Sequence, residues 1–321
     1  MASSAADSTL LAIVVLAYRP DFLDQTLASL AAQAPGAYRI YLFDDAGPEA
    51  VHEAVQRWSD RMALRYHRFP ENLGQYDLAG HWARCIRATQ GEPWVWLFSD
   101  DDVMRPGSVE ALLRKAGEGG LDEGCVYRIP MEMIDAEGHT VTGSGAWPPH
   151  LDAAGYLRQR LGFRLLSSVN EFIFSRASFD AYGFPSFPQA WCADDAAWIR
   201  FGLRGGLVTL QGGGVGWRNS GFNISADIRP KNGKLRIEAC LQYLNWLKEM
   251  AREAPQLRMP LALRMAWLGE HWLMLRPKGH RFPPAYAWAP IRNSLSIPGL
   301  VLLLRWLALR LLRESLISLM R

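Results

Sequence analysis

The chain has 321 residues, 49% of them hydrophobic and 13 of them tryptophan, so it has enough apolar material for a large core and is not a disordered protein. Its formal net charge of +3 is too small to indicate a nucleic-acid partner. The four cysteines lie far apart, without zinc-ligand spacing or the pattern of a disulfide framework, as is typical of a reducing compartment. Residues 1–7 lack the basic region of a signal peptide, so we expect a cytoplasmic protein.

Strand-length apolar runs alternate with helical patterns over the first hundred residues. The pattern predicts strands at residues 10–17, 38–43, 64–69 and 94–98, and helices at residues 21–34, 49–58 and 74–89. Continuously apolar strands that alternate with helices are typical of a mainly parallel sheet covered on both faces. The sequence therefore predicts an α/β fold with a Rossmann-like sheet flanked by helices.

Polar residues follow three of the predicted strands, where the ligands of such sheets bind. These residues are Tyr18-Arg19, Asp44-Asp45 and the triplet Asp100-Asp101-Asp102. Asp-x-Asp spacing places two carboxylates on one side of an extended segment, and such a pair suits Mg²⁺ or Mn²⁺ holding a diphosphate. The alternative is a solvated turn in which Asp102 or Ser108 caps the next helix.

The sequence lacks the glycine motifs of two large groups of nucleotide-binding proteins. It contains no GxxxxGK[ST] motif, which excludes a P-loop, and no GxGxxG follows the first strand. The later glycine run at residues 212–216 has the wrong spacing and begins no helix. A sheet that binds a nucleotide through carboxylates and a metal ion remains.

The order and spacing of these motifs resemble family 2 glycosyltransferases with the GT-A fold. The similarity runs from about residue 10 to residue 225 and includes an acidic turn similar to the one that contacts the nucleotide base in the family. The acidic triplet stands where the family keeps its metal-binding motif. By resemblance, the residues expected to bind the nucleotide sugar are Ala17, Tyr18, Arg19, Asp44, Asp45, Asn72, Gly74, Asp100, Asp101, Arg218, Asn223 and Ser225.

The resemblance implies Mg²⁺ or Mn²⁺, with Asp102 and Asp100 as its expected ligands. Ser99 stands where many relatives carry the first acid of the motif. This departure leaves two sets of ligands open, either Asp100 with Asp102 or Asp101 with one neighbour.

A second acidic pair, Asp194-Asp195, resembles the family's pair that opens a helix and is followed by an arginine, here Arg200. The resemblance assigns Asp195 as the general base. Adjacent carboxylates disfavour joint ionisation, so one of them can keep a raised pKa suited to accepting a proton. A purely structural alternative is that the pair caps its helix.

These parts together imply transfer of a sugar from a nucleotide-diphosphate sugar to an acceptor hydroxyl with inversion. The metal and Arg218 would stabilise the departing diphosphate. Ser220, where the family often has histidine, keeps open a non-catalytic sugar-nucleotide-binding or scaffold protein of an envelope glycan assembly. A nucleotidyltransferase is a weaker alternative, because the chain lacks the glycine-rich basic loop after the first strand.

The C-terminal part changes character, and we divide the chain into a GT-A domain at residues 8–228 and a helical region at residues 229–321. Its last segment, residues 297–320, is rich in leucine but interrupted by Arg305, Arg310, Arg313 and Glu314, which disfavours a spanning helix.

The last three of these charged residues share one helical face. They predict a helix in the membrane interface with its arginines toward headgroups, or else a helix docked on protein. Membrane contact would place the protein peripherally on the inner face of the cytoplasmic membrane, with a glycan or lipid-linked acceptor, in surface polysaccharide or glycoconjugate synthesis.

Overall fold

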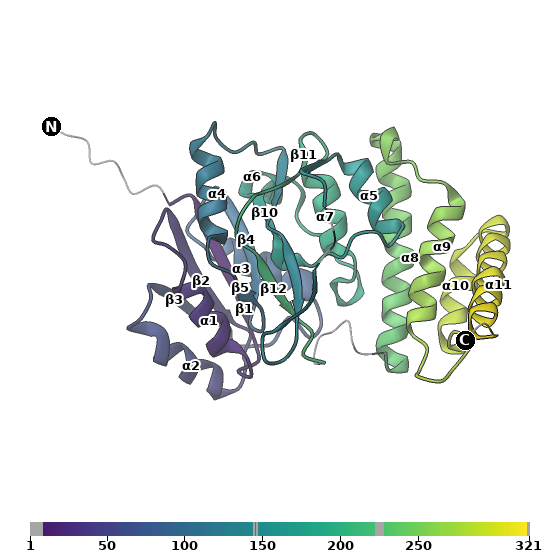
Figure 1. Ribbon diagram of the computed structural model, residues 1–321, viewed down its shortest axis with the longest axis horizontal. Coiled ribbons are helices and arrows are strands. Elements are labelled where there is room, and N and C mark those ends of the chain that lie inside the picture. The colour runs from purple at the N-terminus through teal and green to yellow at the C-terminus, as the bar shows by residue number, and fades with distance from the viewer. Residues whose placement is uncertain (1–8, 144, 146, 222–227, 320–321) are drawn as a thin grey trace.

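The computed structural model describes residues 9–143, 145, 147–221 and 228–319, and its centre is an eight-stranded sheet (Figure 1). The strand order is β3-β2-β1-β4-β10-β6-β11-β9. In chain order these strands are β1 (Leu11–Ala17), β2 (Tyr38–Asp44), β3 (Leu64–Arg68), β4 (Trp94–Ser99), β6 (Cys125–Arg128), β9 (His150–Leu151), β10 (Phe172–Ser175) and β11 (Gly206–Thr209). A smaller sheet of order β5-β12-β7-β8 consists of β5 (Val103–Met104), β7 (Met131–Ile134), β8 (Thr140–Gly143) and β12 (Val215–Arg218).

Helices connect the strands and then continue alone to the C-terminus. Those within the sheet region are α1 (Leu23–Ala31), α2 (Glu49–Ser59), α3 (Leu78–Arg87), α4 (Ser108–Gly117), α5 (Ala153–Leu161), α6 (Arg176–Tyr182) and α7 (Ala193–Phe201), with short 3₁₀ turns η1 (Val169–Glu171) and η2 (Pro188–Ala190). The C-terminal helices are α8 (Pro230–Glu253), α9 (Leu261–Met274), α10 (Trp288–Ser294) and α11 (Ile297–Leu319).

The predicted α/β fold is confirmed, and the sheet is parallel where the sequence alternates most regularly. Strands β3, β2, β1 and β4 are all parallel, whereas β10 runs antiparallel to both β4 and β6. Ala17 pairs with Asp44, and Leu16 pairs with Ser99. This register brings the carboxyl ends of β2, β1 and β4 to one edge of the sheet.

The central strand β1 shows why both faces of the sheet are covered. Leu11, Ile13 and Val15 pack into one core with α1, α2 and α4, whereas Ala12 and Val14 pack into a second core on the side of α3, α5, α6 and α7. All five side chains are fully buried. Because successive side chains of a strand point to opposite faces, a continuous apolar run is what a two-sided core requires.

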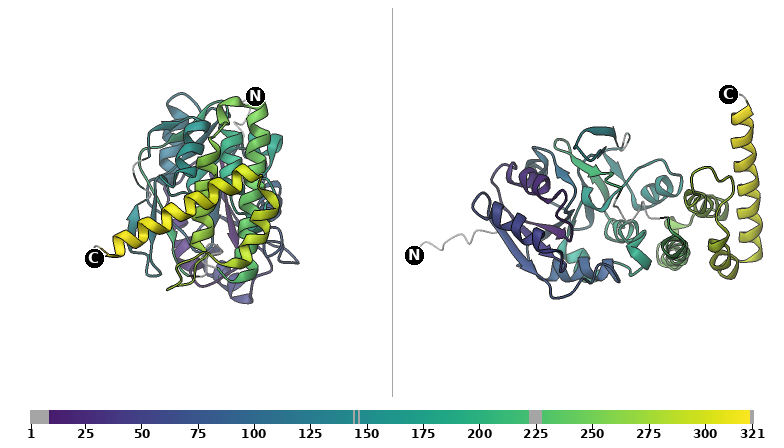
Figure 2. Two further views of the ribbon diagram at one scale, coloured as in Figure 1. Left: turned by 90° about the vertical axis from the view of Figure 1, so that its right-hand side faces the viewer. Right: turned by 90° about the horizontal axis from the view of Figure 1, so that it is seen from below.

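The four C-terminal helices lie beside the sheet region, next to α5 and α7 (Figure 1). The second core extends into them without a break, and Leu303 of α11 belongs to the same cluster as the sheet residues. Helix α11 is outermost and crosses the neighbouring helices obliquely (Figure 2). Within the described residues, none of the helices is both long enough and apolar enough to cross a membrane.

For the inner face of α11, the structure bears out the alternative in which the helix docks on protein. Arg310 donates from Nε to Glu270 of α9 at 3.0 Å, and Glu314 accepts from Arg276 at 3.0 Å. These two residues therefore hold α11 against the protein and do not face headgroups. Arg305 and Arg313 lie on the exposed side. Helical periodicity placed Arg313 on the same face as Arg310 and Glu314, but in the structure Arg313 is exposed while the other two form ion pairs.

Candidate functional site

The three polar strand ends predicted from the sequence are joined by direct contacts. Oδ2 of Asp100, which follows β4, accepts hydrogen bonds from the backbone amides of Tyr18 and Arg19, both at 2.7 Å. The amide of Asp45, which follows β2, donates to the carbonyl of Ala17 at 2.8 Å. The ends of β1, β2 and β4 thus form one continuous polar edge.

The acidic turn after β2 is held by groups of the protein itself. Asp44 is fully buried and accepts from the amide of Gly47, from the Tyr66 hydroxyl and from the Arg68 guanidinium, at 2.7–2.8 Å. Burial, followed by the hydrogen bond to Asp44, raises the pKa of Tyr66 to about 12, which keeps its hydroxyl protonated as the donor. Asp44 therefore fixes the turn and the neighbouring strand β3.

Asp45 connects the same turn to the segment that follows β3. Its carboxylate accepts from the amides of Leu73 and Gly74 at 3.0 and 2.8 Å and forms a close ion pair with Arg84. A Cβ atom at Gly74 would lie only 2.7 Å from the Asp45 oxygen, so this approach requires glycine. The side chain of Asn72, predicted to bind the donor, accepts from the amide of Gln75 at 2.9 Å and shapes this loop.

Asp102 and Arg218 form a buried connection between the two sheets. Asp102 is 1% exposed, and its two oxygens accept from the Arg218 amide at 2.8 Å and from Nδ2 of Asn170 at 2.6 Å. The Arg218 guanidinium is also buried and donates to the carbonyls of Asp101, Asp135 and Ala136 at 2.6–2.8 Å. This network fixes β12 against the tip of β4.

This network argues against two roles expected from the resemblance. The Arg218 side chain points into the protein, where backbone carbonyls and Gln25 accept its hydrogen bonds, instead of toward a diphosphate. Both oxygens of Asp102 already accept hydrogen bonds in the interior, which leaves this carboxylate poorly placed as a metal ligand. Asn223 and Ser225, expected to bind the donor, lie outside the described residues.

Asp100 and Asp101 are both partly exposed, whereas Asp102 is buried. Within the described part of the chain, no other residue donates a hydrogen bond to the Asp101 carboxylate, which lines a small pocket with Arg19, Asp21, Phe22, Asp100 and Ser220. Burial raises the pKa of Asp100, Asp101 and Asp102 to about 7. Three crowded carboxylates with raised pKa values favour a cation or a proton at this tip.

The chemistry of the tip fits a divalent cation that is held jointly with a ligand. Among the described residues, no three acidic, histidine or cysteine side chains are arranged to hold a metal ion by themselves. Mg²⁺ in nucleotide sites is usually bound by one or two carboxylates together with substrate phosphates. Asp101, with the oxygen of Asp100 that does not bind the Tyr18 and Arg19 amides, could supply the protein's share.

The second acidic pair lies in the first turn of α7, where the two members differ in environment. Asp195 is buried and pairs with Arg160 of α5 through two hydrogen bonds of 2.8 and 2.9 Å. The Tyr156 hydroxyl donates a further short hydrogen bond to the same carboxylate. Asp194 is partly exposed.

Sequence reasoning missed Arg160, Tyr156 and the role of Asn170. Arg160 and Tyr156 lie 35 and 39 residues from Asp195, and only their shared helical face, four residues apart, hinted that they act together. Asn170 lies 68 residues from the Asp102 that it holds. No local spacing connects residues so far apart in the chain.

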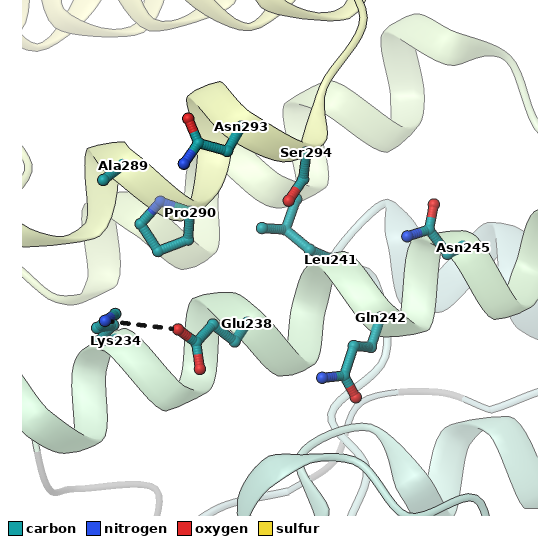
Figure 3. A pocket seen from close by; sticks show the side chains of 9 residues that line it. All are labelled: Lys234, Glu238, Leu241, Gln242, Asn245, Ala289, Pro290, Asn293 and Ser294. Atoms are coloured by element: carbon teal, nitrogen blue, oxygen red, sulfur yellow. Dashed lines mark ion pairs between the residues drawn. The ribbon is translucent and has the colours of Figure 1, made fainter.

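A separate groove of about 350 Å³ lies between α8 and α10 (Figure 3). Its polar lining includes an ion pair between Lys234 and Glu238 at 3.8 Å. None of the site residues predicted from the sequence lines this groove. The strand-end site and the groove are therefore different features of the surface.

Comparison with known proteins agrees with this geometry. Residues 12–160 match the family model described as Glycosyl transferase family 2. This part of the chain is a family 2 glycosyltransferase domain. No curated protein sequence matches the chain.

Two solved structures of S. aureus TarS 1-349 resemble this chain over most of its length. The complex with UDP-GlcNAc has a TM-score of 0.55 and 16% identity, covering 83% of this chain and 81% of that one. The complex with UDP has a TM-score of 0.51 and 14% identity, covering 88% of each chain. The predicted GT-A fold is confirmed, and at these identities the structural likeness concerns the fold.

Proposed function

We propose that this protein transfers a sugar from a nucleotide-diphosphate sugar to the hydroxyl of an acceptor with inversion. The observation that carries the proposal is the joined polar edge at the ends of β1, β2 and β4, within the family 2 domain. The similar TarS structures contain UDP-GlcNAc and UDP, which supports a uridine nucleotide as the first donor to test.

The donor would bind along the strand ends. Tyr18 is 44% exposed at the end of β1 and offers an aromatic face to a nucleotide base. Arg19 is the cation beside Asp100 and Asp101, where a diphosphate would lie. Asp44, Asp45, Asn72 and Gly74 act on the donor indirectly, because they shape the wall of the site.

Asp101 and Asp100 would hold Mg²⁺ or Mn²⁺ together with the diphosphate. A bound cation would offset the negative charge that develops on the departing nucleoside diphosphate. Asp101 does not accept a hydrogen bond from another described residue, so it can face the cation without breaking the hydrogen bonds that hold the tip of β4.

The Asp194–Asp195 pair would supply the general base. In a single displacement, the acceptor oxygen bonds to the anomeric carbon as the bond to the diphosphate breaks and the nucleoside diphosphate leaves with the electron pair. The acceptor proton passes to the base. One displacement inverts the anomeric centre and requires no covalent enzyme intermediate.

We further propose that α11 contacts the inner face of the cytoplasmic membrane during synthesis of a surface polysaccharide or glycoconjugate. The outer side of this helix carries seven large apolar side chains that are 46–78% exposed, among them Leu304, Leu312 and Leu316. Arg305 and Arg313 are exposed on the same helix. Apolar side chains combined with arginines suit an anionic lipid surface.

The experiment that tests the donor proposal is thermal unfolding of the protein with nucleoside diphosphates, each with and without Mn²⁺. We expect UDP to raise the unfolding temperature and Mn²⁺ to increase that rise. A metal-dependent shift with another nucleotide would change the donor but keep the reaction class. The absence of any shift would favour a scaffold protein and contradict the proposal.

A further inference from the structure

The Asp195 carboxylate is engaged in more interactions than a proton acceptor needs. Arg160 donates from Nε to Oδ1 at 2.8 Å and from Nη2 to Oδ2 at 2.9 Å, while the Tyr156 hydroxyl donates to Oδ1. The same guanidinium donates from Nη1 to the Leu165 carbonyl at 2.8 Å, which fixes its orientation. Bidentate arginine–carboxylate pairs are among the strong hydrogen-bonded interactions of proteins, and they fix the geometry of the carboxylate.

Asp194 differs from its neighbour in each of these respects. Within the described residues, no side chain donates a hydrogen bond to its carboxylate, and the residue is partly exposed. Burial and then the charge of Asp195 raise the pKa of Asp194 to about 7, although Arg160 opposes this rise. The other titratable groups near the pair are Tyr156, Cys192 and Tyr243, and burial raises the pKa of each well above its ordinary value.

The buried His271 of α9 lies within electrostatic reach of Arg160. Burial and the neighbouring cations, Arg160 and Arg236, lower its pKa to about 3, so it is neutral. Among the residues that the structure describes, Arg160 is the cation that contacts the pair, and it does so through Asp195. Asp194 is left as the group that can exchange a proton.

The backbone that leads into α7 is strained. Gln189, Ala190 and Cys192 all have positive φ, between 51° and 66°; the first two are adjacent, and one residue separates Ala190 from Cys192. Residues without glycine's freedom hold such conformations only where their surroundings enforce them, and they gather at functional sites. Here the strained segment ends immediately before Ala193 and Asp194, so it determines how the first turn of α7 is presented.

We infer that Arg160 and Tyr156 are positioning residues that lock Asp195, and that Asp194 is the proton acceptor of the transfer reaction. This inference rests on the proposed function, and it reverses the roles that family resemblance assigns to the two acids. The proton leaves the acceptor hydroxyl for a carboxylate oxygen of Asp194 as the new glycosidic bond forms. Asp195 remains paired with Arg160 while its neighbour takes the proton.

The first test compares Asp194→Asn with Asp195→Asn by the release of UDP from UDP-GlcNAc between pH 5 and 9. We expect Asp194→Asn to lose at least a hundredfold in kcat at every pH while UDP binding is unchanged. Asp195→Asn should retain measurable turnover. The acid limb of its pH profile of kcat should lie at lower pH than that of the wild type, because the charge that raises the pKa of Asp194 is gone. Full activity of Asp194→Asn beside an inactive Asp195→Asn would overturn the inference.

Arg160 gives a matched pair of variants. Arg160→Gln removes the cation that lowers the pKa of Asp194, so the acid limb of the pH profile of kcat should move to higher pH. Arg160→Lys keeps the charge but cannot pair through two hydrogen bonds, so kcat should fall several-fold while the limb stays near its wild-type position. If Arg160→Gln and Arg160→Lys have the same pH profile of kcat, Arg160 is merely structural, and the positioning role is contradicted.

A titration that needs no turnover separates this inference from the proposed function. Carbon-13 NMR of aspartate carboxyls, with Asp194→Asn to assign the signal, should show Asp194 titrating near pH 7. The midpoint should move down in Asp195→Asn. A midpoint near 4 in the wild type would overturn the inference even if UDP binds, and a midpoint near 7 would support it even if UDP-GlcNAc is the wrong donor.

Discussion

At the residue scale, three adjacent aspartates have the same chemistry but different partners. Asp100 holds the amides after β1, Asp102 holds β12 and Asn170, and Asp101 opens toward the pocket beside Arg19. Position in the hydrogen-bond network, not residue type, therefore separates a structural carboxylate from one free to meet a ligand.

We expect Asp101→Asn to remove the Mn²⁺-dependent part of the stabilisation by UDP without harming the fold. Asp102→Asn is the contrasting variant. An amide NH₂ group would face the Asn170 donor, so the free energy of unfolding should fall by about 1–3 kcal/mol. Thermal unfolding with UDP, with and without Mn²⁺, measures both effects. Metal-dependent stabilisation that survives in Asp101→Asn would refute the ligand assignment.

The effect of Asp101→Asn on the free energy of unfolding depends on pH, and the direction of this dependence follows from the pKa of Asp101. The pKa of Asp101 is raised to about 7, so the folded state binds more protons than the unfolded state between about pH 4 and pH 7. Stability contributed by this group is therefore lost as the pH rises through that window. Without ligands, Asp101→Asn should be more stable than the wild type at pH 8, and this advantage should be absent at pH 4.

At the element scale, local periodicity predicted the first hundred residues closely. The strand expected at residues 38–43 is β2 (Tyr38–Asp44), and the helix expected at residues 49–58 is α2 (Glu49–Ser59). These elements follow from apolar spacing, which is a local property. The smaller sheet and the antiparallel β10 could not be predicted in this way, because their pairings join segments far apart in the chain.

The site shows the same division. Chain order was enough to predict that Tyr18, Asp45 and Asp100 meet at one edge, because the carboxyl ends of parallel strands coincide. The direction of the Arg218 side chain was not predictable, because its partners come from two separate loops and from α1. Resemblance to a family assigned it a role toward the ligand that its buried contacts do not support.

The attachment of α11 depends on one close approach between helices. A Cβ atom at Gly269 of α9 would lie 2.2 Å from the Trp306 ring of α11. We expect Gly269→Val to displace α11, which should expose residues 294–297 to limited proteolysis and lower the unfolding temperature. Gly299→Ala is the control, because its Cβ would make ordinary contacts of 3.5–3.6 Å. Equal proteolysis of both variants would show that this contact does not hold the helix.

At the scale of the whole molecule, α11 is attached through one face and leaves the other uncovered. Leu303 and Leu311 are buried, and Arg310 and Glu314 form ion pairs on the same inner side. The outer side is apolar, with Arg305 and Arg313. From Arg276 to Arg313 the chain has seven lysines and arginines and no acidic residue, a charge pattern that favours anionic lipid over a second copy of this basic segment.

This arrangement predicts which substitutions release the protein from lipid. The double variant Leu304→Glu/Leu312→Glu should not sediment with vesicles that contain phosphatidylglycerol, because it places two carboxylates on the apolar face. The control, Gln56→Glu/Ser59→Glu, adds the same charge at exposed positions of α2 and should sediment like the wild type. Arg305→Gln/Arg313→Gln should bind roughly thirtyfold more weakly and lose most of its salt dependence, because each of the two arginines near an anionic surface contributes about 1 kcal/mol.

A second copy of the chain is the competing occupant of this face, and the same variants distinguish it from lipid. Sedimentation velocity without vesicles should show one concentration-independent species for the wild type. If the wild type instead forms a dimer that Leu304→Glu/Leu312→Glu dissociates, the exposed leucines serve self-association. If both Leu304→Glu/Leu312→Glu and Arg305→Gln/Arg313→Gln bind vesicles like the wild type, any membrane contact lies elsewhere on the protein. Binding that requires both the leucines and the arginines would orient α11 with its outer face in the lipid and its inner face on α9, which keeps the donor site on the protein side of the interface.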